Sequence, residues 1–264
     1  MRKTLTTVSQ VNRPKTGAMK AFERNLEGVA HMLKASGREI ALVKASAAKM
    51  VAFVKPLPDL KSEPARTKFI RSVTRFSKNL TTGVDRYNTI KMWQAVILVT
   101  CVEAYLQDVL TAAARVDKSL MSRSEQSVLY AEVVEAASLE LLADDMRTRW
   151  ARGWLNEGGP KAWISRLQKM GARGYAEDLG SRLELLWGIR HLVVHAAGIA
   201  TADFVKRHSN FRAAVGQRIH FSNSDLTGFL NAVKEFVEPT EIFVLARWPS
   251  LIVHDVDAPL TKPS

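Results

Sequence analysis

Residues 88–116 read NTIKMWQAVILVTCVEAYLQDVLTAAARV, and this stretch decides the fold. It is long and almost apolar all round, which is the pattern of a helix buried at the centre of a bundle. Its most apolar part, MWQAVILVTCV, is too short to span a bilayer and runs directly into Glu103. The stretch therefore predicts the central helix of an all-α protein and no membrane span.

Helical segments are also predicted before this stretch. Residues 18–54 carry an amphipathic pattern, and Gly37 is expected to divide them into two helices. Residues 55–64 contain three prolines and predict a linker. A basic segment follows and predicts a helix that ends near Gly83.

Four further helices are predicted after the stretch 88–116, and local sequence signals indicate where they begin and end. The first is capped by Ser122 or Ser124 and precedes a turn at 156–160. A short helix then ends at Gly171, and the next covers 177–195 and is capped by Gly198. The last helix begins at Ser222 or Ser224 and is broken or kinked at Pro239. Residues 216–223 alternate enough to allow one short β-arm. The predicted fold is an all-α helical bundle over 92–250, with a basic helical segment 1–91 before it and a polar tail 251–264.

The positive charge of the chain lies in its first third. The formal net charge is +12, and residues 1–91 hold 19 Lys and Arg against 6 Asp and Glu. Residues 92–264 hold 19 against 20. This regional excess favours a surface that binds a polyanion, most often nucleic acid, over a basic helix that is merely soluble.

The compartment is expected to be the cytoplasm. The first residues, MRKTLTTVSQVNRPKTG, hold no apolar segment of the signal-peptide kind. The single cysteine, Cys101, has no partner in the chain and is expected to be a buried structural thiol.

One arginine and two histidines interrupt the apolar helix predicted over 177–195. Leu179, Leu183, Leu186 and Val193 mark its buried stripe, and Arg190 falls on or beside that stripe. A charge there needs a carboxylate, a phosphate or a water-filled cleft. His191 and His195 are four residues apart and share a second face.

Three interpretations of these residues compete. The structural one pairs Arg190 with an acid such as Glu103 and lets the histidines cap helix-end carbonyls. A zinc site is possible for His-x3-His on a helix, yet no third ligand is indicated and Leu192 stands where metalloproteases carry Glu. The third is RNA cleavage without metal or cofactor: Arg holds phosphate oxygens, and His moves protons to and from ribose oxygens.

The segment Arg190-His191-Leu-Val-Val-His195 resembles the R-x4-6-H motif of HEPN domains, and its context LLWGIRHLVVHAAGIATADF resembles the family's apolar helix followed by a turn with glycine. The likeness covers roughly residues 88–245 and is closest to the RiboL-PSP-HEPN type. This sequence has His191 where the family often has Asn, and Ala196-Ala197 where many relatives have Asn-Gly.

The resemblance implies a helical bundle that forms a homodimer, with the motif helices facing each other across a shared cleft. It implies a metal-independent endoribonuclease of a toxin–antitoxin or antiviral defence system, with RNA as substrate and an antitoxin or another defence protein as partner. Arg190 and His195 would contact phosphate and catalyse, and His191 would modulate them. Some members of the family only bind, so an inactive RNA-binding or regulatory module is the alternative. The basic segment 1–91 either extends the RNA-binding surface or packs on the bundle or a partner chain.

Overall fold

A computed structural model describes residues 14–32, 34–35, 63–122, 127–220 and 222–253, and only the backbone of residues 63–86. The described residues form helices, turns and loops without a β-strand, so the predicted all-α fold is confirmed. The expected break at Gly37, the proline stretch 55–62, the alternative cap at Ser124 and the tail after residue 253 lie outside the described residues.

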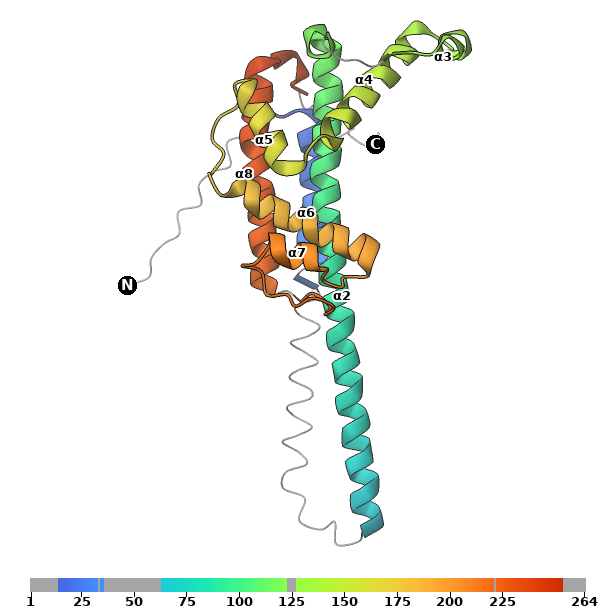
Figure 1. The fold of residues 1–264 in the computed structure, drawn as a ribbon, viewed down its shortest axis with the longest axis vertical. Helices are drawn as coiled ribbons and strands as arrows, with labels where there is room; N and C mark the ends of the chain where they lie inside the picture. The colour runs from blue at the N-terminus through green and yellow to red at the C-terminus, as the bar shows by residue number, and fades with distance from the viewer. Residues whose placement is uncertain (1–13, 33, 36–62, 123–126, 221, 254–264) are drawn as a thin grey trace, which may run out of the picture.

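Residues 17–32 form the first helix. In chain order the later helices are α2 (Glu63–Val116), η1 (Lys118–Met121), α3 (Tyr130–Glu135), α4 (Leu139–Asn156), α5 (Gly159–Lys169), α6 (Leu179–Ala196), α7 (Ala202–Arg207), α8 (Asn223–Arg247) and η2 (Pro249–Leu251). Figure 1 shows α2 and α8 running along the length of the bundle, with α6 crossing between them and α7 beside α6. The short α3 and the start of α4 project to one side.

The α2 helix is one continuous helix of 54 residues. The expected end near Gly83 is wrong, because α2 runs through that residue. A glycine inside a helix costs only about 1 kcal/mol relative to alanine, which a helix anchored by its buried half tolerates. The boundary expected after residue 91 therefore lies inside a helix, and the first part of α2 extends beyond the bundle (Figure 1).

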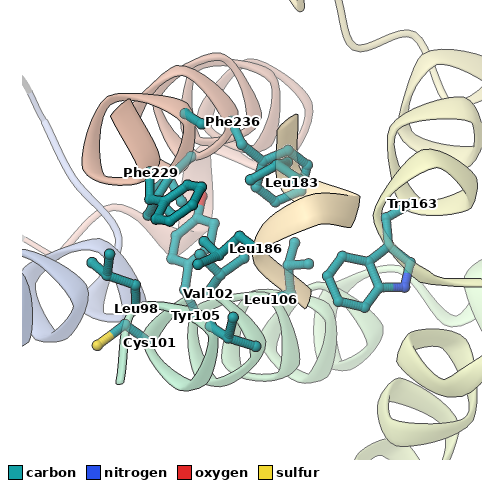
Figure 2. Close-up of a cluster of buried hydrophobic side chains, with 14 of the residues drawn as sticks. Leu98, Cys101, Val102, Tyr105, Leu106, Trp163, Leu183, Leu186, Phe229 and Phe236 are labelled. Atoms are coloured by element: carbon teal, nitrogen blue, oxygen red, sulfur yellow. The ribbon is translucent and has the colours of Figure 1, made fainter. Parts of the chain in front are cut away.

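The core lies where α2, α6 and α8 meet. Figure 2 shows side chains of α2 facing those of α6 and α8, with Trp163 of α5 at the edge. The α2 side chains drawn there include Leu98, Val102, Tyr105 and Leu106, all of them buried. Cys101 is also buried, as predicted, and burial raises the pKa of its thiol.

The helix of residues 17–32 shares this core. Phe22 and Val29 are buried in it, and the Phe22 ring lies 5.7 Å from the ring of Tyr105. At the start of this helix the Thr16 N–H donates to Glu241 Oε1 at 2.6 Å, and Thr16 Oγ1 donates to Glu241 Oε2 at 3.0 Å. This part of the basic N-terminal segment is therefore packed on the bundle.

Two predicted features of the C-terminal half are corrected. Of the two alternatives expected at Pro239, a break or a kink, the break is not found: α8 continues through Pro239 to Arg247, because residues on both sides of the proline, Phe236 and Val244 among them, are buried. The β-arm expected at 216–223 is reduced to one isolated bridge, between Ile199 and Arg218. At Pro239, the packing of α8 outweighs the loss of one backbone hydrogen bond.

Among the other helix boundaries, those of α5 and α8 follow the expected signals. The cap expected at Ser122 is not found, because Ser122 ends η1 and α3 begins after Leu129. Ser222 caps α8, and its hydroxyl accepts from the Asp225 N–H. The α5 helix ends at Lys169, just before the turn at Gly171. The single helix expected after residue 122 is divided, because Ala136 to Ser138 separate α3 from α4 and Ser138 caps the second of them.

One segment of α2, Tyr87–Val116, is long and apolar enough to cross a membrane by length and composition alone. Within its most apolar window, 50% is buried inside the bundle. The core helix of a globular protein passes the same test, and the contacts of this segment with α6 and α8 are those of a core helix.

Candidate functional site

The α6 helix carries the predicted site residues. Its buried stripe is the expected one, since Leu179, Leu183 and Leu186 are fully buried and Val193 nearly so. The helix ends at Ala196, where Ala197 and Gly198 take left-handed φ values of 49° and 78°. The Gly198 N–H donates to the Leu192 carbonyl at 2.9 Å, which closes the helix as the sequence predicted.

Arg190 faces α2. Its Nη2 lies 3.4 Å from Oε2 of Glu103. The other carboxylate oxygen of Glu103, Oε1, accepts a hydrogen bond from Trp187 Nε1 at 3.2 Å. Burial raises the pKa of Glu103, and Arg190 and Trp187 oppose that rise. The Arg190 Nε atom is buried and has no hydrogen-bond partner among the described residues. The ion pair of the structural interpretation is therefore present, and it links α6 to α2.

His191 and His195 lie together on another face of α6. Their rings are 4.7 Å apart, both side chains are exposed, and both line a cleft of about 470 Å³. The cleft lies between α6 and α7. We call it the histidine cleft, and it is lined by Gly188, His191, Leu192, His195, Ala196, Thr201, Asp203, Phe204, Arg207 and His208.

The position of α7 follows from local packing. The turn at Gly198 reverses the chain, and the Thr201 hydroxyl accepts from the Phe204 N–H at 3.2 Å to cap α7. Phe204 is buried and lies against α6 at Gly188. A Cβ at Gly188 would lie 3.1 Å from the Phe204 ring and 2.8 Å from His208 Nε2, so a glycine here lets α7 approach closely.

The α7 helix brings residues to the cleft that the sequence did not single out. Arg207 and His208 stand at its end, and Asp203 stands in its first turn. The His208 ring lies 4.8 Å from the Phe204 ring and is half-buried. Burial lowers the pKa of His208, and the positive charges of Arg207 and Lys161 lower it further, against an opposite effect of Glu184.

Arg190 does not line the histidine cleft. It lies about 100° from His191 and about 140° from His195 around an ideal helix, and its guanidinium is engaged by Glu103 on the α2 side. Within one chain the structure therefore brings His191 and His195 together and leaves Arg190 apart from them.

The chemistry available in the cleft is proton transfer beside a cation. Imidazoles accept and donate protons near neutral pH, and a guanidinium binds the oxygens of an anion. In the described part of the chain, no group of three or more His, Cys, Asp or Glu is placed to hold a metal ion.

Comparison with known proteins adds no relative from which a role could be transferred. No protein-family model, curated protein or solved structure matches this chain.

Proposed function

We propose that the chain is a metal-independent endoribonuclease of the HEPN class, with the histidine cleft as its active site. The observation that carries the proposal is the juxtaposition of His191 and His195, two exposed imidazoles 4.7 Å apart that line one cleft beside Arg207. Two proton-transfer groups and a phosphate-binding cation are what RNA cleavage needs, because RNA supplies the attacking 2′-hydroxyl.

The proposed reaction is transesterification. The 2′-oxygen attacks phosphorus and the bond from phosphorus to the 5′-oxygen breaks. One imidazole of the His191–His195 pair accepts the 2′-proton, and the other, protonated, donates to the leaving 5′-oxygen. The product ends in a 2′,3′-cyclic phosphate. Arg190 acts indirectly in this proposal, since its ion pair with Glu103 fixes the orientation of α6.

A homodimer is part of the proposal. Trp93 of α2 is 54% exposed and Val194 of α6 is 49% exposed, although both belong to helices that form the core. Val194 is one helical turn from Arg190. Contiguous exposed apolar side chains are typical of surfaces that bind another protein, and a second copy fits the family expectation. Membership of a toxin–antitoxin or defence system, with a matching protein partner, is proposed on the same resemblance.

One observation favours a second function, RNA binding without cleavage. Arg190, the arginine of the motif, is held by Glu103 outside the cleft. Incubating the purified protein with RNA in EDTA separates the two functions, because the enzyme cleaves under these conditions and the binding module leaves the RNA intact.

The basic first part of α2 is expected to dominate nonspecific RNA affinity. Residues 63–86 of this helix hold two acidic residues and the six basic residues Arg66, Lys68, Arg71, Arg75, Lys78 and Arg86. Replacing Arg66, Arg71 and Arg75 by glutamine should lower the slope of log affinity against log salt by about 0.7 for each lost phosphate contact with single-stranded RNA. Fluorescence anisotropy at several salt concentrations measures this slope.

A variant with the same loss of charge elsewhere is the control for this measurement. Lys118, Arg152 and Lys169 are exposed residues of the bundle, and their replacement by glutamine should leave the slope nearly unchanged. Equal slopes for both triple variants would assign the basic part of α2 to packing or to a protein partner.

A further inference from the structure

The positive charge of the histidine cleft comes from α7. Neither arginine of α6 lines the cleft: Arg190 pairs with Glu103, and Arg182 pairs with Asp178 and Glu235. Arg207 does line it, together with the two histidines of α6. A phosphate in this cleft would therefore meet the guanidinium of Arg207 in the same chain.

Arg207 is held loosely where it stands. Its ion pair with Asp203, from Nη2 to Oδ2, is 3.9 Å long, and the two side chains are 74% and 84% exposed. An exposed pair of this length is weak and readily exchanged for another anion. The Arg190 pair is shorter and better shielded, with 39% and 28% exposure, so Arg190 is the less available of the two.

The pKa of His208 depends on the charge in the same region. Its imidazole is half-buried against Phe204 and over Gly188. Burial and the neighbouring charge of Arg207 lower its pKa. An anion that binds Arg207 would offset that positive charge and raise the pKa of His208.

We propose that Arg207 is the residue that binds the substrate phosphate in the histidine cleft, in place of Arg190. The planar guanidinium can exchange the Asp203 carboxylate for two phosphate oxygens and bind both at once. The substrate class follows: a phosphodiester whose phosphate enters between α6 and α7. This inference rests on the proposed function for its choice of substrate, and its test measures binding without cleavage.

The test compares two neighbouring residues of α7. The probe is a fluorescent 2′-O-methyl RNA oligonucleotide, which lacks the attacking hydroxyl and cannot be cleaved. Arg207→Gln should weaken its binding about tenfold, whereas Lys206→Gln, an equal loss of charge at an exposed residue that does not line the cleft, should change it less than about twofold. Equal effects of the two variants, or a larger effect of Arg190→Gln, would overturn the proposal.

A second readout places the phosphate next to α7. In an NMR titration of the histidines, the probe should raise the pKa of His208 in the wild-type protein and leave it unchanged in Arg207→Gln. A His208 signal that ignores the probe in the wild-type protein would overturn the proposal. If these effects are found and the wild-type protein leaves ordinary RNA intact, the binding role of Arg207 stands and the proposed nuclease activity fails.

Discussion

Replacing His195 by alanine is expected to lower the rate of RNA cleavage by roughly two to four powers of ten, the range for the loss of a general acid or base. His195 lines the histidine cleft beside His191. Its side chain is exposed, so alanine removes little packing. The measurement is the initial rate of cleavage of a labelled RNA, with circular dichroism and the melting temperature as the check on folding.

His220→Ala is the matched control. His220 is an exposed histidine that does not line the cleft, so its loss should leave the rate within about twofold of wild type. His191→Ala should resemble His195→Ala. A folded His195→Ala protein that cleaves RNA at the wild-type rate would exclude this residue from catalysis.

Replacing Glu241 by alanine is expected to lower the free energy of unfolding by about 3 kcal/mol or more, because buried donors that lose their acceptor cost roughly 1–3 kcal/mol each. The buried carboxyl of Glu241 accepts from the Thr16 N–H, from Thr16 Oγ1 and from the Tyr105 hydroxyl, the last at 2.9 Å. Three elements therefore meet at one side chain: the start of the first helix, α2 and α8. Urea denaturation followed by circular dichroism measures the loss.

Two further variants calibrate that measurement. Glu238→Ala removes an exposed carboxyl from the same helix and should change the free energy of unfolding by less than about 0.5 kcal/mol. Tyr105→Phe removes one donor and leaves Thr16 bound, so it should cost about 1 kcal/mol. If Glu241→Ala were as stable as Glu238→Ala, the first helix would not be anchored through this residue.

The features that local sequence signals predict are those set by short-range geometry. Ser222 caps α8 because its hydroxyl satisfies a free N–H of the first turn, and this depends on neighbours in the sequence. The buried stripe of Leu183 and Leu186 follows from the helical period. Gly198 ends α6 because a left-handed residue is needed there. Such signals need no knowledge of the tertiary fold.

The features that sequence analysis missed depend on contacts between distant segments. Pro239 is a local signal for a break, and the burial of α8 on both of its sides overrides that signal. Glu241 looks like any helical carboxylate until Thr16, far away in the chain, is packed against it. The all-α class is robust to these errors because it depends on the sum of many apolar contacts.

Only part of the candidate site could be predicted, because the rest of it also depends on contacts between distant segments. The adjacency of His191 and His195 follows from their spacing of four. Arg207 and His208 enter the cleft because α7 folds back on α6, which no local pattern reports. Gly188 was the available signal: a glycine inside an apolar helix usually marks a close approach, and here His208 and Phe204 make that approach.

The most direct test is to incubate the purified full-length protein with RNA in EDTA and to identify the ends of the products. Cleavage in chelator that leaves a 2′,3′-cyclic phosphate or its 3′-phosphate product, and that is lost in His195→Ala, is the expected result. Intact RNA in the wild-type reaction, or cleavage that requires an added divalent metal ion, would contradict a metal-independent nuclease site at His191 and His195.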